Sequence, residues 1–483
     1  MRPVLVLSAL LWSGAAYADS LHVLHNFSGP DGQSPTGLIQ AFDGKIYGVG
    51  ANGGDQETCD PDGCGVVFSV GLDGAFTKLH DFHTDDGYQP TGLVEAGHGK
   101  FYGTTFRGGA ASSGGGGVLY SITSTGKFKV LYRFNDGFTC CGPAMPSGHL
   151  VKAKDGNYYG ESQNGGDFRD VDHGNGLGTV YRFDPKTNAI TVIHSFSLAD
   201  SSGVFPFGPL SLGKDGALYG TTRENESGGA PSAFRIDTAG NFSVVASLPG
   251  TEPVAGVIQA WNGDFYGTDD GGPSKGSLFR INGKGKVVII NKFDGADGKG
   301  PRYQFTPYGD GFFYSNAQEG GLLDPQGGSI FRIDSTGDLR VLHSFDPTLP
   351  NGIFPNSTFV SANDGLMYGT GALGGSNGRG TVFSFDPLDL GPVQSVSFDK
   401  AHVKSGHSIH GMVTLFAPAG VDTVVHLGAV AGPVTVPATV TVKAGEQSAD
   451  FKAKTFKIGA KNDVRVYASL DGQGTRTVLT VVP

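Results

Sequence analysis

Residues 92–105 read GLVEAGHGKFYGTT, and six other segments repeat this phrase. The other copies are GLIQAFDGKIYGVG (37–50), HLVKAKDGNYYGES (149–162), PLSLGKDGALYGTT (209–222), GVIQAWNGDFYGTD (256–269), QFTPYGDGFFYSNA (304–317) and TFVSANDGLMYGTG (358–371). Each copy carries a tyrosine at the same place: Tyr47, Tyr102, Tyr159, Tyr219, Tyr266, Tyr314 and Tyr368. A period of about fifty residues is typical of an array of identical supersecondary units.

Each repeat contains four strand signals. In the copy that begins at residue 92, we expect strands over 92–96, 101–105, 118–123 and 128–134, with apolar and polar residues alternating as in half-buried strands. The third strand carries an aromatic residue in every copy: Phe68, Tyr120, Tyr181, Phe234, Phe279, Phe331 and Phe383. A four-stranded sheet that is repeated radially is a propeller blade.

The two ends of the repeat region predict the number of blades. The first three strands occur seven times, whereas a fourth strand follows a third strand only six times. The segment LHVLHNF, residues 21–27, precedes the first complete blade and can pair with residues 381–385. We therefore predict an all-β fold, a seven-bladed β-propeller over 19–391 closed by its N-terminal strand, because closure pairs the last open edge. Six blades, eight blades and an open solenoid are the alternatives.

After Pro387 the repeat stops. Residues 392–483 alternate as VHLGAV, TVPATVTV, SADFKAKTF, DVRVYASL and TVLTVVP, which is about one strand per ten residues. This spacing predicts a small β-sandwich of the immunoglobulin type without the buried Cys–Trp–Cys signature. Such modules usually space or present another domain.

The N-terminus reads as a secretory signal peptide over 1–18. Arg2 is followed by an apolar run, and Ala16-Tyr17-Ala18 is a small-x-small cleavage site. We expect cleavage after Ala18 and a secreted or periplasmic protein. No later stretch has eighteen consecutive apolar residues, so no membrane span is expected.

The net charge limits the class of partner, and the cysteines indicate the redox compartment. A formal net charge of −10 argues against nucleic acid as a partner and is compatible with a neutral or cationic ligand. Cys59 and Cys64 bracket DPDG and are expected to form a disulfide in an oxidising compartment. Cys140 and Cys141 could form a vicinal disulfide, bridge elsewhere or stay reduced. The four cysteines lack the spacing of a zinc site.

The unit GLVEAGHGKFYGTTFRGG followed by GGVLYSITSTGKFKVLYRF resembles the GloVer-type tandem repeat of bacterial secreted proteins. The resemblance covers residues 21–387, and the segment VTVPATVTVKAGEQSADFKAKT is similar to an immunoglobulin-like repeat of bacterial surface proteins. The fifth copy departs most, and the sixth has Tyr-Ser in place of Tyr-Gly. The resemblance implies a secreted repeat protein with a C-terminal anchor, yet no sorting signal is recognisable. It implies no particular reaction and no catalytic residues.

The recurring side chains are expected to be structural. The seven tyrosines occur in every blade before a small residue, as packing between blades requires, with hydroxyls bonded to the backbone. His25, His80, His194 and His343 fall in the outer fourth strand, far from the axis. Residues that break the repeat are better candidates for function.

The loops sort into two classes. Links between first and second strands, such as FDGK and NDGL, have hairpin-turn chemistry. The second-to-third loops and the crossovers between blades are long, and both classes emerge on one side, which we call the long-loop face. A ligand is expected there. The candidate ligand-binding residues are Arg107, Arg169, His173, Arg223, Asp269, Asp270, Arg302, Tyr303 and Arg379.

One loop has a weak metal signal. Asp167, Asp170 and Asp172 lie in a string that resembles the start of a calcium loop but lacks its later ligands. Calcium is the one cofactor that the sequence admits, and none is otherwise expected.

Two functions fit the sequence. The first is a non-catalytic binding or adhesion protein that recognises an extracellular glycan or protein at the long-loop face. The second is a secreted polysaccharide lyase or hydrolase with its site at the same face. The sequence has no GxSxG, HExxH or P-loop motif. Convergence of irregular charged residues with a His or Tyr would keep the enzyme hypothesis open, because catalysis needs proximity.

Overall fold

The computed structural model describes residues 21–483 except 58, 60–61, 110–114, 136–141, 168–175, 198–202, 224–229, 249–252, 272–273, 309, 324–326, 390, 430–431 and 471–472. The chain divides into two compact units, Leu21–Asp389 and a second that contains Leu390–Pro483. All the elements assigned in these ranges are strands, and none of the described residues forms a helix with the length and apolarity of a membrane span.

Within the described part of Leu21–Asp389, the strands form seven antiparallel sheets. Sheet 1 contains β2 (Gln33–Gln40), β3 (Ile46–Asn52), β4 (Val66–Val70) and β5 (Phe76–Asp81). Sheet 2 contains β6 (Tyr88–Gly97), β7 (Lys100–Arg107), β8 (Val118–Thr123) and β9 (Phe128–Arg133). Sheet 3 contains β10 (Pro143–Lys152), β11 (Tyr158–Gly165), β12 (Thr179–Asp184) and β13 (Ala189–Ser195). Sheet 4 contains β14 (Val204–Pro206), β15 (Ser211–Leu212), β16 (Leu218–Arg223), β17 (Ser232–Ile236) and β18 (Phe242–Ser247).

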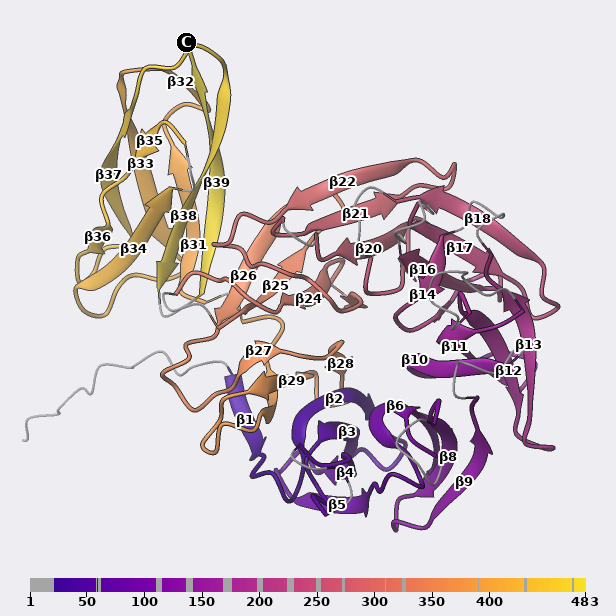
Figure 1. Cartoon of the computed structure of the whole chain (residues 1–483). Coiled ribbons are helices and arrows are strands. Elements are labelled where there is room, and N and C mark those ends of the chain that lie inside the picture. Colours follow the sequence, from indigo (N-terminus) through magenta and orange to yellow (C-terminus); the bar gives the residue numbers. More distant parts are fainter. Residues whose placement is uncertain are drawn as a thin grey trace, which may run out of the picture. The chain divides into compact units, whose positions relative to one another are not determined.

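The remaining three sheets follow the same order. Sheet 5 contains β19 (Ile258–Gln259), β20 (Phe265–Asp269), β21 (Ser277–Ile281) and β22 (Val287–Lys292). Sheet 6 contains β23 (Thr306–Pro307), β24 (Phe313–Ala317), β25 (Ser329–Ile333) and β26 (Leu339–Ser344). Sheet 7 contains β27 (Ile353–Pro355), β28 (Val360–Ser361), β29 (Met367–Leu373), β30 (Thr381–Phe385) and β1 (Leu21–Asn26). Figure 1 shows the sheets following one another in chain order, from indigo β2 to orange β29, around a common centre.

The first strand of this unit pairs with the last. β1 runs antiparallel to β30, with Leu21 opposite Phe385 and Asn26 opposite Thr381. The backbone N–H of Ser34, in sheet 1, donates to the carbonyl of Arg379, in sheet 7. Sheets 1 and 7 are therefore joined directly, although they stand at opposite ends of the repeat region in the sequence.

The recurrent tyrosines are buried, as the repeat predicts, with exposed fractions of 0–7%. The expectation that their hydroxyls can find backbone partners holds for Tyr314, whose Oη donates to the Pro387 carbonyl at 3.0 Å, but most copies bond to a side chain. Tyr47 Oη donates to Asp43 Oδ2 at 2.8 Å, four residues earlier in the Asp-Gly turn. Tyr159, Tyr219, Tyr314 and Tyr368 bond in the same way to Asp155, Asp215, Asp310 and Asp364. The aspartate of the Asp-Gly turn therefore also orients the tyrosine side chain. The spacing of residues in the sequence does not predict this second role.

Glycine and proline join neighbouring sheets. Six glycines that precede a third strand have φ between 92° and 105°, a range that favours glycine: Gly65, Gly117, Gly178, Gly276, Gly328 and Gly380. A Cβ atom built on any of them would lie 2.4–3.1 Å from Cδ of the proline at the start of the next sheet. For Gly380 this proline is Pro35 in sheet 1, so the contact also links sheet 7 to sheet 1.

The residue before this proline is held in a left-handed conformation. Its φ lies between 50° and 55° at Ser34, Gln89, Met145, Phe205 and Phe354, where non-glycine residues seldom have positive φ. In each case its N–H donates to a carbonyl of the preceding sheet, for example Phe205 to Leu177 at 2.9 Å. The hydrogen bond between sheets compensates for the unusual backbone.

The recurrent histidines of the fourth strand also have structural partners. His25 pairs with Asp31 at 2.9 Å and stacks on Phe76 of the next sheet, with ring centroids 3.7 Å apart. His80 pairs with Asp86 at 3.0 Å and stacks on Phe128. These contacts support the interpretation of the fourth-strand histidines as part of the packing between sheets.

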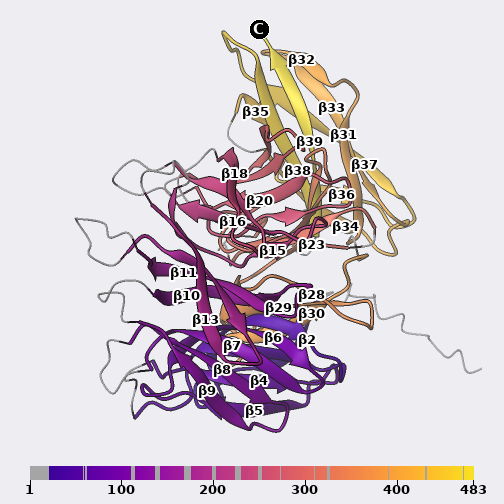
Figure 2. The same cartoon turned by 90° about the vertical axis from the view of Figure 1, so that its right-hand side faces the viewer.

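The second unit contains two sheets in its described residues. The first consists of β31 (Val393–Phe398), β33 (Ser408–Leu415), β37 (Ser448–Thr455) and β35 (Val434–Thr435). The second contains β32 (His402–Lys404), β39 (Gln473–Val482), β38 (Asn462–Leu470), β34 (Thr423–Ala429) and β36 (Thr439–Val442). Both contribute to one core, which includes Val396, Val413, Val425, Val466 and Leu479. Figure 2 shows β38 beside β39 in this two-sheet unit.

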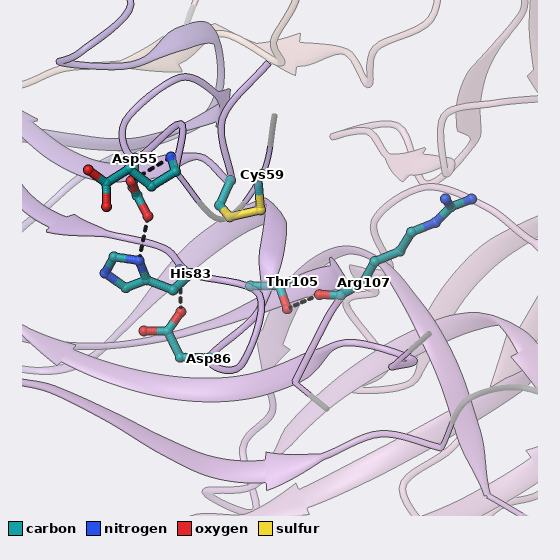
Figure 3. Close-up of a disulfide and its surroundings, with 8 residues drawn as sticks. Asp55, Cys59, His83, Asp86, Thr105 and Arg107 are labelled. Carbon is teal, nitrogen blue, oxygen red and sulfur yellow. Dashed lines mark hydrogen bonds and ion pairs between the residues drawn. A yellow bond between two sulfur atoms is a disulfide. The ribbon is translucent and has the colours of Figure 1, made fainter. Parts of the chain in front are cut away.

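The predicted disulfide between Cys59 and Cys64 is present. It lies in the loop between β3 and β4, beside a pair formed by His83 Nδ1 and Asp55 Oδ2 at 2.7 Å (Figure 3). Cys64 is fully buried. Cys140 and Cys141 lie outside the described residues.

Replacing both Cys59 and Cys64 with serine is expected to lower the free energy of unfolding by about 2 kcal/mol, because the cross-link closes a short loop. Urea unfolding of the oxidised protein and of the variant measures this difference. Dithiothreitol should remove the difference in stability between the wild-type protein and the variant. Equal transition midpoints for the two oxidised proteins would contradict the expectation.

Candidate functional site

A cavity of about 860 Å³ lies among the first strands of the seven sheets. All seven sheets contribute to its wall. The lining residues are Thr36, Gly37, Leu38, Ile39, Ala51, Asn52, Gln89, Pro90, Thr91, Phe106, Ser147, Gly148, His149, Phe207, Gly208, Pro209, Arg223, Val254, Ala255, Asp270, Arg302, Tyr303, Gln304, Thr358 and Phe359. The cavity has the size of a small-molecule site.

Glycines at the innermost positions shape this cavity. A Cβ on Gly37 would lie 2.7 Å from Gly92 Cα, and one on Gly148 would lie 2.8 Å from the carbonyl oxygen of Gly208. The inner backbones therefore approach closely where a side chain would separate them. Larger side chains enter the wall from neighbouring positions and set its chemistry.

An ion pair stands in the wall. Arg302 Nε lies 3.0 Å from Asp270 Oδ2. The Asp270 side chain is 4% exposed, whereas that of Arg302 is 50% exposed. The buried Asp270 carboxylate thus orients Arg302, and the remaining N–H donors of Arg302 can reach the cavity.

A second arginine stacks on an aromatic ring. The guanidinium carbon of Arg223 lies 3.8 Å from the ring centroid of Phe207, and both residues line the cavity. Arg223 ends β16, and Phe207 follows β14, so pairing of these two strands brings the residues together. Cation–π contact with the ring orients the guanidinium.

Tyr303 and His149 are the other titratable groups in the wall. Burial raises the pKa of Tyr303, and its hydroxyl donates to Asn356 Oδ1. Burial lowers the pKa of His149 to about 4, so its imidazole is neutral at physiological pH. Each is a hydrogen-bonding group rather than a charge at neutral pH.

The side-chain amide of Gln304 connects two sheets of the cavity wall. Gln304 Nε2 donates to the carbonyl of Pro209 at 2.9 Å, which links sheets 6 and 4. Sequence reasoning missed both Gln304 and His149. The signal was present, because they stand where the first two copies of the repeat have Gly37 and Gly92.

The cavity brings together four of the predicted ligand-binding residues: Arg223, Asp270, Arg302 and Tyr303. The other three that the structure describes do not line it. Arg107 is exposed at the end of β7, as Figure 3 shows, and Arg379 Nη1 donates to Gln33 Oε1 at 2.7 Å. Asp269 is buried and accepts from the N–H of Gly271.

The loop with the weak calcium signal is only partly described. Arg169, Asp170, Asp172 and His173 lie outside the described residues. The Ser195 hydroxyl lies 3.5 Å from Asp167 Oδ2. Among the residues that have assigned positions, no three His, Cys, Asp or Glu side chains form a group that could hold a metal ion.

Three segments of the sequence match the model of the Gloeobacter/Verrucomicrobia repeat: residues 13–207, 143–306 and 270–420. Together they cover most of the chain. No curated protein sequence matches at a significant level.

Several solved structures are similar in shape. A candidate TolB from Agrobacterium tumefaciens is 12% identical, with a TM-score of 0.35 over 65% of this chain and 95% of its own. An exo-β-1,3-galactanase from Phanerochaete chrysosporium is 10% identical, with a TM-score of 0.32 over 93% and 95%. An endo-arabinase from Bacteroides thetaiotaomicron is 12% identical, with a TM-score of 0.30 over 55% and 96%. These scores are too low to carry an argument about activity.

Proposed function

Because the chain belongs to the Gloeobacter/Verrucomicrobia repeat family, we propose that it is a secreted binding protein that takes an extracellular glycan into the cavity among the first strands. In this proposal, the seven sheets are the blades of a propeller that β1 closes, and the second unit is an immunoglobulin-like module that presents it. The disulfide, together with the signal peptide that the sequence predicts over 1–18, supports an oxidising compartment outside the cytoplasm.

The composition of the cavity wall carries this proposal. It combines the partly exposed aromatic side chains of Phe106 and Phe207 with the amides of Asn52 and Gln89. Aromatic faces can stack on sugar rings, and side-chain amides can both donate to and accept from hydroxyl groups. A mostly apolar wall with a few polar groups is typical of ligand sites.

The titratable groups in the described wall favour binding over turnover. Hydrolysis of a glycosidic bond usually needs two carboxyl groups. Asp270 is the only carboxylate among the described lining residues, and it is paired with Arg302. His149 is a weak base with its pKa lowered to about 4, and the raised pKa of Tyr303 makes its phenolate difficult to form.

A polysaccharide lyase is the second candidate, and one observation favours it. Arg223, Asp270 and Arg302 converge at one cavity together with Tyr303 and His149. A lyase uses a cation against the substrate carboxylate and a Tyr or His as base. This convergence keeps the second candidate open.

The mature chain is expected to bind at least one member of a panel of neutral and acidic oligosaccharides without releasing products. Isothermal titration measures the binding, and chromatography of the reaction mixture, with and without calcium, detects cleavage. The variant Thr358→Phe should place a bulky ring in the cavity wall and weaken binding at least tenfold. Asn363→Phe, on an exposed short turn, is the matched control and should bind normally.

Turnover that Thr358→Phe abolishes would replace the binding proposal with the lyase. Binding that both phenylalanine variants retain would place the ligand elsewhere. Failure of the mature chain to bind any oligosaccharide of the panel would overturn the proposal.

A further inference from the structure

We propose that the glycan bound in the cavity is acidic, and that Arg302, assisted by Arg223, binds the carboxylate of a hexuronate unit. This inference rests on the proposed function and specifies the class of its ligand. It departs from the expectation, based on the net charge of the chain, of a neutral or cationic ligand.

The first argument is the local charge. Arg223 and Arg302 are the positive side chains of the described wall, and Asp270 is its one negative side chain. Asp269, next in sequence, is buried and faces the Gly271 N–H and the Ser277 hydroxyl rather than the cavity. Among the described lining residues, positive side chains therefore exceed negative ones by one, although the whole chain has a formal net charge of −10. A positive local charge favours an anion.

The second argument is the geometry of Arg302. Its Nε lies 3.0 Å from Asp270 Oδ2, and half of the side chain remains exposed. A guanidinium has five N–H donors in a planar fork. When Asp270 occupies Nε, donors on the two terminal nitrogens remain in place for a second carboxylate. Asp270 fixes the orientation of the fork before a ligand arrives, which lowers the entropic cost of binding.

The third argument is the neighbourhood of the two arginines. Tyr303 and Gln304 follow Arg302 directly and also line the cavity, as does Phe207 beneath Arg223. A uronate has a carboxylate, several hydroxyl groups and an apolar ring face. The wall offers Arg302 for the carboxylate, the amides of Asn52 and Gln89 for the hydroxyl groups and the ring of Phe106 for the apolar face.

The test compares trigalacturonate with its methyl ester, which differs by the charge of the carboxyl groups. In titration calorimetry with the full mature chain, the acid should bind at least tenfold more tightly than the ester. Arg302→Gln should weaken binding of the acid about tenfold and leave binding of the ester nearly unchanged. Arg302→Lys keeps the charge but loses the fork, so its affinity for the acid should be intermediate.

Lys154→Gln is the matched control, because it removes an exposed positive charge that does not line the cavity. It should bind both probes as the wild-type protein does, and circular dichroism should show that all variants fold. Equal affinity for acid and ester, or full acid binding by Arg302→Gln, would overturn the inference while the glycan proposal stands. Binding of neutral oligosaccharides alone would have the same consequence, whereas binding of no glycan would overturn both.

Discussion

Replacing Gly178 with alanine is expected to lower the free energy of unfolding of the Leu21–Asp389 unit by about 2–5 kcal/mol. Two costs add. Gly178 has a φ of 99°, which an L-residue with a Cβ rarely adopts. The new Cβ would also lie 2.4 Å from Pro206 Cδ and 2.8 Å from the carbonyl oxygen of Ser162. Both neighbours belong to paired strands, so neither can move without disturbing a sheet. Denaturant unfolding followed by tryptophan and tyrosine fluorescence measures the loss.

Gly365→Ala separates the two costs. Gly365 has a φ of 86°, but a Cβ there would meet nothing within 4 Å. This variant should therefore show the backbone cost alone, about 1 kcal/mol. Adding Pro206→Ala to Gly178→Ala removes one of the clashing atoms, so the double variant should lose less than the two single variants together. Equal losses for Gly178→Ala and Gly365→Ala would show that the contact between sheets costs little.

The second prediction is a gain in stability. Glu161 lies in β11, where four other repeats have threonine, and it is 1% exposed. Neither carboxyl oxygen has a hydrogen-bond partner among the described residues. Burial raises the pKa of Glu161 well above its ordinary value. Glu161→Gln is therefore expected to be more stable than the wild-type protein by more than about 1 kcal/mol at pH 7.

The pH dependence identifies the cause. Below the ordinary pKa of a glutamate, the carboxyl group is protonated in both the folded and the unfolded chain, and the variant should gain little. As the pH rises above that value, the unfolded chain releases the proton while the folded chain retains it. Each pH unit up to the raised pKa therefore costs the wild-type fold about 1.4 kcal/mol. The gain from Glu161→Gln should grow with pH across this window.

Urea unfolding at pH 4, 5, 6 and 7 measures this profile. Glu57→Gln, at an exposed position, is the control and should change stability little at any pH. Glu161→Thr restores the residue of the other repeats and should also stabilise, because Thr221 is buried at the equivalent place and donates to the Ala255 carbonyl. A constant effect of Glu161→Gln across the pH series would mean that its ionisation is not the cause.

Much of the arrangement of strands follows from the sequence, because the repeat samples one local structure seven times. The Tyr-Gly phrase locates the second strand, and its buried tyrosine confirms the packing role. The hydrogen bond between the tyrosine and the turn aspartate was not predicted from the sequence. An Asp-Gly pair is already expected in a hairpin turn, so the aspartate gave no sign of a second role. The left-handed residue before proline was also invisible, because Ser34, Gln89 and Met145 share no chemistry.

The site was predicted in part. Arg223, Asp270 and Arg302 were identified because they interrupt the repeat at the ends of strands or in crossovers. Arg107 and Arg379 satisfy the same rule but do not line the cavity, because the direction of a side chain at a strand end depends on local backbone angles. His149 and Gln304 were missed although they also replace a glycine of the repeat.

The left-handed position has a consequence for how such a protein can change its ligand. Its backbone is fixed by an N–H bond to the preceding sheet and by the following proline, and different side chains are tolerated there. The position already holds Ser, Gln, Met and Phe, and at Gln89 it reaches the cavity wall. It resembles a variable position in an antibody loop, where the backbone scaffold stays constant while the side chain can be changed. Randomising the codon of Gln89 would diversify the wall of the cavity while the sheets retain their connections.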